Sequence, residues 1–174
     1  VITVASGSSY AKGIGANGCH SSQRYMRLAV ARGTTTTFDF ALRDASTNAL
    51  VSLPNFDVVV LDLDKQTNAI YETLAVTGHA SYTVDAATDL IVGGNSSNPT
   101  LQGTVRNLDN PSDPSSLTTA QMRSAASFLM SGTASWQMTF GISAGSPSGA
   151  RNAFIGGKSS LVCALSSGEP LVAD

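Results

Sequence analysis

The stretch WQMTFGI, residues 136–142, places large apolar side chains at every second position. A period of two is typical of a strand that buries one face and exposes the other. Residues 25–31 show the same alternation, with Arg27 on the polar side, and residues 37–43 do so with Asp39 on that side. Three separate segments therefore predict strands that each bury one face.

Weaker strand patterns lie between clusters of Gly, Pro, Asn and Ser, at residues 1–5, 71–76, 81–84, 89–92, 100–105, 127–130, 153–155 and 160–165. Many short strands separated by turn residues favour an all-β fold, an antiparallel two-sheet sandwich resembling a jelly roll. One short helix is expected near 118–124, because Thr118 and Gln121 have capping-box spacing. No repeat or linker divides the chain, so we expect a single domain over residues 1–174.

The composition limits the classes of partner. Charged residues make up only 13% of the chain and the net charge is −2, which argues against binding to nucleic acid or to an anionic membrane surface. No apolar run is long enough to span a bilayer. Ser, Thr, Gly and Asn fill most polar positions, and the first residue is Val1, which is typical of a processed, exported chain. We expect a secreted protein at a cell surface or in an extracellular matrix, with an organelle lumen as the alternative.

Two further features fit export. Cys19 and Cys163 lie near opposite ends of the chain, and in an oxidising compartment a disulfide between them would close nearly all of it. Two buried free thiols are the alternative. Asn95 begins the triplet Asn95-Ser96-Ser97, which is an acceptor sequence for N-glycosylation.

Two catalytic or cofactor motifs are incomplete. GIGANG, residues 13–18, has the glycine spacing of a dinucleotide site, but an alternating strand pattern follows it where a helix is required. GISAG, residues 141–145, has the spacing of a hydrolase nucleophile elbow around Ser143, but a Pro/Gly turn follows and both histidines come earlier in the chain. Neither motif predicts an enzyme.

The stretch FDVVVLDLDKQTN, residues 56–68, ends its hydrophobic strand with two carboxylates. In an extended strand Asp62 and Asp64 share one face about 6.5 to 7 Å apart, and Val59, Leu61 and Leu63 share the other. Like charges at this distance repel unless a cation, an arginine or water lies between them.

Three occupants fit the gap between these acids. Calcium would need further oxygen ligands from other loops, for which Asp44 and Glu72 are candidates, giving a metal site of Asp62, Asp64, Asp44 and Glu72. An arginine such as Arg151 or Arg43 would instead make a structural pair. The two acids could also serve as acid and base of a glycosidase, whose carboxylates lie about 5 to 9.5 Å apart.

Several short segments resemble a secreted β-sandwich module of algal and marine bacterial surface and matrix proteins. They are FDF at 38–40, LPNF at 53–56, LDLD at 61–64, Glu72, Gly78, Tyr82, NPSDP at 110–114, LT at 117–118, GARN at 149–152 and KSSL at 158–161. The resemblance implies a sandwich fold, export, and a role in extracellular binding or assembly. It also implies calcium at the acidic strand end.

The leading hypothesis is a noncatalytic, exported binding or assembly module, stabilised by calcium, that contacts a protein partner, its own copies or a glycan. Aromatic residues make up only 6% of the chain, which favours protein assembly over glycan recognition. The candidate aromatic platforms for a sugar are Tyr10, Tyr25, Tyr71 and Tyr82. The alternatives are an accessory subunit of a larger complex in an organelle lumen and a carbohydrate-active enzyme that uses Asp62 and Asp64.

Overall fold

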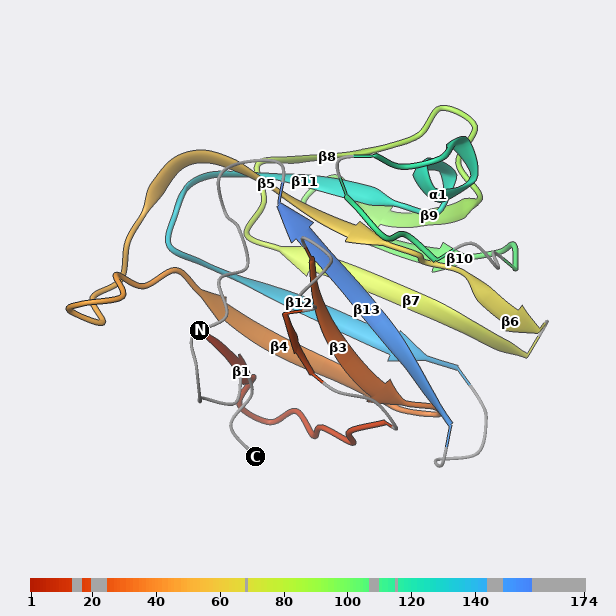
Figure 1. Ribbon diagram of the computed structural model, residues 1–174, viewed down its shortest axis with the longest axis horizontal. Helices are drawn as coiled ribbons and strands as arrows, with labels where there is room; N and C mark the ends of the chain where they lie inside the picture. Colours follow the sequence, from red (N-terminus) through yellow and green to blue (C-terminus); the bar gives the residue numbers. More distant parts are fainter. Residues whose placement is uncertain are drawn as a thin grey trace.

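The computed structural model describes residues 1–13, 17–19, 25–67, 69–106, 110–114, 116–143 and 149–157. These residues form two antiparallel β-sheets packed face to face, with one short helix (Figure 1). The all-β, two-sheet sandwich predicted from the alternating patterns is confirmed.

Each sheet is described by its strands in spatial order. Sheet A contains β1 (Ile2–Val4), β4 (Thr35–Ala41), β12 (Ser135–Ile142), β7 (Ile70–Thr77), β10 (Asn98–Gly103) and β9 (Leu90–Asn95), and β6 (Lys65–Thr67) pairs with β7. Sheet B contains β2 (Gly18–Cys19), β3 (Tyr25–Ala31), β13 (Ala150–Gly157), β5 (Leu53–Leu61), β11 (Ala126–Thr133) and β8 (Ser81–Val84).

The chain crosses repeatedly between the two sheets. From β3 to β5 it passes from sheet B to sheet A and back, and from β11 to β13 it does so again. The last described strand, β13, inserts between β3 and β5, while β12 inserts between β4 and β7. This interleaving of early and late strands in both sheets is the jelly-roll arrangement.

A single apolar core fills the space between the sheets. Sheet A contributes Phe38, Leu74 and Phe140, and sheet B contributes Val60 and Phe128, all essentially inaccessible to solvent. These side chains occupy alternate positions of their strands, so period-two burial explains both the strands and the packing of the two layers. The outward positions between them are left for polar residues.

The helix α1 (Thr119–Arg123) begins where the sequence predicts it. The Thr118 side chain accepts a hydrogen bond from the backbone N–H of Gln121, and the Gln121 side chain accepts one from the backbone N–H of Thr118, a complete capping box. Among the described residues, no helix has the length and apolar character that crossing a bilayer requires.

Most predicted strands appear with ends shifted by a few residues, and residues 25–31 and 81–84 match β3 and β8. The predicted strand at 160–165 lies outside the described residues. Strands β2 and β6 were not predicted, because two or three residues are too few to display a period. Lys12 and Gly13 run alongside β3 in extended pairing. Residues 14–16 of the GIGANG motif lie outside the described residues.

Candidate functional site

The acidic segment after β5 does not continue as a strand. Strand β5 ends at Leu61, and Asp62 has a positive φ of 62°, a left-handed conformation that Asp tolerates better than most residues. The next residue, Leu63, donates its backbone N–H to the carbonyl of Ser124 at 2.8 Å. The prediction that an extended backbone places Asp62 and Asp64 on one face is therefore wrong.

The apolar residues of this segment are also divided differently. Leu61 packs with Tyr25 and Phe154 in a small cluster in which Val59 is a partly buried member, whereas Leu63 belongs to the main core between the sheets. The predicted shared face of Val59, Leu61 and Leu63 is therefore wrong. The left-handed turn at Asp62 explains the difference, because it interrupts the alternation that would have kept the three together.

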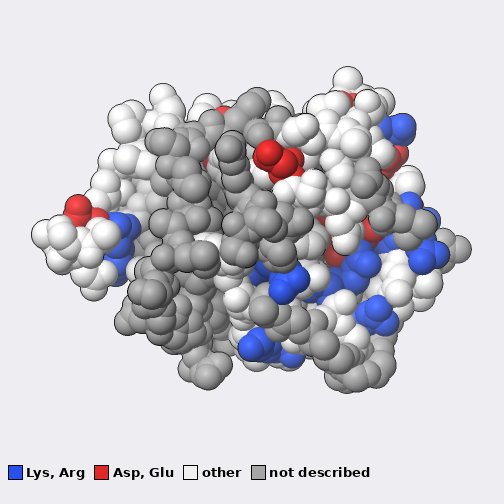
Figure 2. Space-filling view, viewed as in Figure 1, with Lys and Arg blue, Asp and Glu red and all other residues white. Residues whose placement is uncertain are grey.

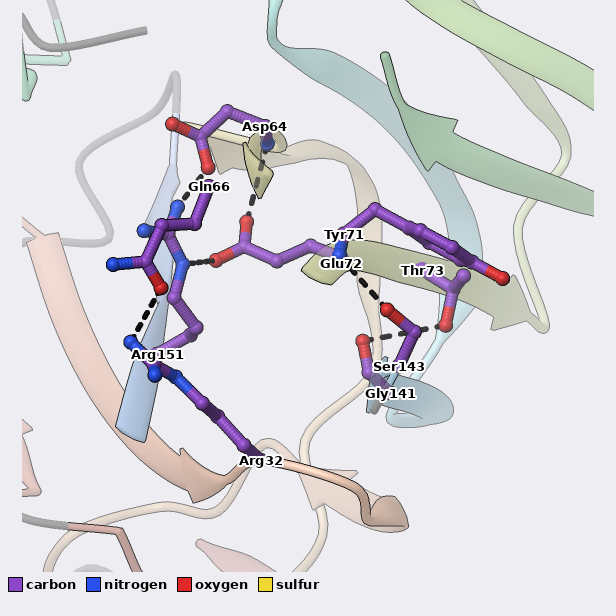
Figure 3. Close-up of polar contacts among 9 residues, drawn as sticks. All are labelled: Arg32, Asp64, Gln66, Tyr71, Glu72, Thr73, Gly141, Ser143 and Arg151. Carbon is purple, nitrogen blue, oxygen red and sulfur yellow. Dashed lines mark hydrogen bonds and ion pairs between the residues drawn. The ribbon is translucent and has the colours of Figure 1, made fainter. Parts of the chain in front are cut away.

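Arg151 and Glu72 meet across the end of the sandwich. Arg151 lies two residues before Ala153 on the inward face of β13, and Glu72 lies two residues before Leu74 on the inward face of β7. Arg151 Nε donates a hydrogen bond to Glu72 Oε1 at 2.6 Å, and Arg151 Nη2 forms an ion pair with the Asp64 carboxylate. The Asp64 backbone N–H donates to Glu72 Oε2 at 3.2 Å, which closes the group (Figure 3).

We call Asp64, Glu72 and Arg151 the inter-sheet clamp. It joins β13 of sheet B to β7 of sheet A and to the segment that follows β5. Of the two residues that sequence reasoning proposed as arginine partners, Arg151 makes this contact, whereas Arg43 donates to the carbonyl of Asn48 at 2.7 Å. The structural pairing with Arg151 is therefore confirmed for Asp64, and Glu72, which was predicted only as a calcium ligand, joins the same pair.

Burial dominates the electrostatics of the clamp. The Asp64 and Glu72 side chains are each 2% exposed and that of Arg151 is 20% exposed. Desolvation, with the charge of Asp62 as a second cause, raises the pKa of Glu72 well above its usual range. Desolvation lowers the pKa of Arg151, and the charge of Asp62 opposes this change. Asp62 thus acts electrostatically on the clamp although it lies outside it.

A second arginine lies beside the clamp. Arg32, in the turn after β3, donates a hydrogen bond from Nη2 to the side-chain oxygen of Gln66 in β6. Figure 3 shows Arg32 and Gln66 next to Arg151. The positive charge of Arg32 adds to the lowering of the Arg151 pKa. The charged group at this end of the sandwich therefore extends from β3 to β7.

Asp44 does not join the acids near the clamp. It lies in the loop that projects at the left of Figure 1, while β6 and the start of β7 lie at the right. Its Oδ1 accepts hydrogen bonds from the backbone N–H and hydroxyl groups of Ser46 and Thr47, which hold the pKa of Asp44 well below its usual value. The predicted ligand set of Asp62, Asp64, Asp44 and Glu72 is therefore not brought together.

The described residues contain no group of three or more His, Cys, Asp or Glu side chains placed to hold a metal ion. The positive charge between Asp64 and Glu72 is supplied by Arg151. A calcium ion bound at these two carboxylates would have to displace that guanidinium. The residues of this region do not fit the predicted calcium site, and calcium binding by the protein stays a prediction.

The hydroxyl of Ser143 anchors a chain segment. It donates to the carbonyl of Ala69 at 2.8 Å. It also accepts the backbone N–H of Tyr71 at 2.9 Å (Figure 3). His79 lies beyond the opposite end of β7 from Tyr71, about 25 Å away along an extended strand. His79 therefore cannot activate Ser143, whose contacts stabilise the start of β7.

Three of the four candidate tyrosine platforms pack into the protein. Tyr25 is 3% exposed, the Tyr10 ring packs on Phe38, and the Tyr82 ring is partly buried against the main core. Tyr71 is half-buried on β7 and shares the outward positions of that strand with Thr73. Tyr25 also takes an outward position, on β3, but is buried against Leu61 and Phe154. Tyr71 is the one of the four that is both outward-facing and partly exposed.

The predicted glycosylation site is described by the structure, whereas only one of the two cysteines of the predicted disulfide is. Asn95 is exposed at the end of β9, where its Oδ1 accepts the backbone N–H groups of Ser97 at 3.1 Å and Asn98 at 2.9 Å. Its place on a hairpin turn leaves it accessible from solvent. Cys19 lies in β2, and Cys163 lies outside the described residues, so the disulfide between them stays a prediction.

Charged side chains are distributed unevenly over the surface. Figure 2 shows the side of the molecule on which sheet B lies toward the viewer, and its Lys and Arg side chains gather over β3, β13 and β6.

Comparisons of the chain with protein-family models, curated proteins and solved structures found no match. The resemblance to a secreted algal and marine bacterial module therefore stays a prediction, and a function has to be argued from this chain alone.

Proposed function

We propose that the protein is a noncatalytic, exported binding module that presents the faces of its sandwich to a partner. The observation that carries this proposal is the inter-sheet clamp. Asp64, one of the two acids proposed for catalysis, is bound to Arg151 in the clamp, and both acids are buried. We therefore place the binding site on the outer surface of the sandwich. A low content of charge and a polar surface rich in Ser and Thr support an extracellular setting.

Burial of the acids argues against the rival proposal of a carbohydrate-active enzyme. A general acid or base has to reach within hydrogen-bonding distance of its substrate. Asp62 is 5% exposed and Asp64 is 2% exposed, and Arg151 is bound to Asp64. A sugar could approach these carboxylates only if the clamp opened.

An activity assay distinguishes the binding module from the carbohydrate-active enzyme. The purified chain is incubated with soluble β-glucans, xylan, mannan and chitin oligosaccharides, and released reducing ends are measured. We expect no release above a heat-treated control. Release that disappears in both Asp62→Asn and Asp64→Asn, with folding verified by circular dichroism, would establish the enzyme and exclude the binding module.

The edge of sheet A favours a second candidate function, an accessory subunit of a larger complex in an organelle lumen. Strand β9 ends sheet A, and Ile91 and Val92 within it are 56% and 41% exposed. An open strand edge with apolar side chains is a surface that a strand of another chain can cover. Purification of the protein from its source in a stable complex of fixed composition would support this candidate over an independent module.

Calcium binding and export have separate tests. Calcium is titrated calorimetrically into chelator-treated protein, and the melting temperature is measured in parallel. Absence of both heat and a change in melting temperature at millimolar calcium would remove calcium from the proposal.

Expression in a secreting eukaryotic host, followed by intact mass measurement before and after glycosidase treatment, tests export and the use of Asn95.

A further inference from the structure

The outer face of sheet A carries an array of threonines. Their strands place the core residues Phe38, Leu74, Leu101 and Phe140 inward, so the alternate positions point outward. We call this surface the threonine face, defined by Thr35, Thr37, Thr73, Thr77, Thr100 and Thr139.

The register of the strands aligns these residues in rows. One row runs Thr37, Thr139, Ala75, Thr100, Gly93 across five neighbouring strands. Neighbouring strands lie about 4.8 Å apart, so the row extends for roughly 19 Å. No residue of this row is larger than threonine, and therefore no side chain of the row protrudes far from the sheet.

The next row continues the pattern. It runs Thr35, Gly141, Thr73, Gln102, Ile91 across the same strands. A Cβ at Gly141 would lie 2.6 Å from Thr73 Oγ1 and 2.7 Å from Thr35 Oγ1, so the glycine makes room for the two hydroxyl groups on either side. The hydroxyl groups of Thr37 and Thr139 are hydrogen-bonded at 2.9 Å in the adjacent row.

The face is almost free of charge. At the outward positions of β1, β4, β12, β7, β10 and β9, all fully described, Asp39 is the one residue charged at neutral pH. Gln137 Nε2 donates to its Oδ1 at 2.8 Å. In β6, at one end of the sheet, Lys65 pairs with Tyr71 and adds a positive charge beside the array. The opposite side of the molecule carries the lysines and arginines seen in Figure 2. The middle of the threonine face thus offers no charge to a partner, and a charged partner would lose water there without gaining an ion pair.

We infer that the threonine face binds the surface of a flat, uncharged polysaccharide. A flat array of hydroxyl groups offers both donors and acceptors, which neutral sugar rings also present. Tyr71, half-buried at one end of the array, provides one ring for stacking against a sugar. The inference rests on the proposed binding function and names its partner by chemical class.

Many weak contacts would supply the affinity. A hydrogen bond exchanged with water contributes only about 1 kcal/mol net, so a single sugar would bind poorly to a face with one aromatic ring. An extended, rigid polysaccharide surface can contact several rows together, and its chains lose little freedom on binding. The face is therefore expected to prefer insoluble polysaccharide to short oligosaccharides.

The test is co-sedimentation of the purified chain with microcrystalline cellulose, insoluble chitin and insoluble mannan. Thr100→Lys and Thr139→Lys place a hydrated charge on the face, which would lose its water against a neutral surface. Thr83→Lys is the matched control, because Thr83 is an exposed strand threonine on sheet B. We expect binding of at least one of the three polysaccharides, at least 10-fold weaker binding by both face variants, and unchanged binding by the control. Tyr71→Ala is expected to weaken binding about threefold or more.

Three results would overturn the inference. They are absence of binding to all three neutral polysaccharides, equal binding by the wild type and both face variants, and retention only by anionic alginate or by growing ice crystals. Binding that survives the face variants would leave the proposed binding function standing and move the site elsewhere. Release of sugars in the activity assay would instead overturn the proposed function itself.

Discussion

Arg151 Nε lies 2.6 Å from Glu72 Oε1 and joins an inward position of β13 to an inward position of β7 across the two sheets. Removing the guanidinium by Arg151→Ala leaves Asp64 and Glu72 buried without their cation. Loss of one partner of a buried ion pair costs about 3 to 5 kcal/mol, so we expect the free energy of unfolding to fall by that amount in urea denaturation.

Arg123→Ala is the matched control for the clamp. Arg123 pairs with Asp89 at 2.7 Å, but its side chain is 41% exposed, and exposed pairs contribute about 0 to 1 kcal/mol. Equal losses of stability in the two variants would show that the inter-sheet clamp contributes no more than a surface ion pair.

The raised pKa of Glu72 predicts a pH dependence with a definite sign. The folded protein holds the Glu72 proton to a higher pH than the unfolded chain does. Between the two pKa values the folded state binds more protons, so this group lowers stability as the pH rises. Glu72→Gln removes the titration, and each unit of pKa difference corresponds to about 1.4 kcal/mol.

We therefore expect the stability of Glu72→Gln relative to the wild type to increase as the pH is raised from about 4.5, the usual range of a glutamate. Urea unfolding of both proteins over a series of pH values measures the difference in their free energies of unfolding. Titratable groups that both proteins share cancel in this difference. A relative stability that decreases with pH would mean that pairing with Arg151 outweighs burial and holds the Glu72 pKa down.

Gly103 of β10 packs closely against the backbone of Asp64. A Cβ at this position would lie 2.4 Å from the Asp64 carbonyl oxygen and 2.6 Å from its Cα. Backbone cannot rotate away, so Gly103→Ala is expected to cost about 1 to 3 kcal/mol of unfolding free energy. Gly93→Ala is the control, since its Cβ would meet the movable Thr100 side chain at 2.9 Å. Equal stability of Gly103→Ala and the wild type would contradict the close packing.

No strand among the described residues pairs with the outer edge of β9, which predicts concentration-dependent association. No charged residue or proline lies in Leu90–Asn95 to discourage pairing with another strand. Ile91→Lys introduces a charge at an exposed position, so we expect less association in sedimentation velocity at high protein concentration and a stability within about 0.5 kcal/mol of the wild type. Unchanged association in this variant would exclude β9 as its site.

The predicted disulfide between Cys19 and Cys163 can be tested in protein secreted under oxidising conditions. Peptide mapping without reduction should yield one linked pair of peptides. A bridge that closes so long a loop stabilises by about 4 to 5 kcal/mol in chain-entropy models, and reduction should lower the free energy of unfolding by that order. Two alkylatable thiols in the folded, unreduced protein would contradict the bridge.

Local sequence patterns predicted the layers but could not predict every contact between them. Phe38, Phe128 and Phe140 show their inward positions by alternation alone, because a strand places every second residue on the same face. The same alternation places Arg151 on the face of Ala153 and Glu72 on the face of Leu74. An inward arginine and an inward glutamate therefore follow from the strand pattern. A pairing of Arg151 with Glu72 was not predicted, since alternation along a strand does not say which strands face each other. An arginine was offered only as one of three alternatives between Asp62 and Asp64.

Local patterns were sufficient to predict the all-β sandwich, the helix cap at Thr118 and a chain poor in charge, because each depends on composition or on neighbours along the chain. Only the folded arrangement brings Asp64 to Arg151 and aligns threonines from four strands in rows. These contacts join residues far apart in the chain. Strand order and register create them, and no local pattern encodes either.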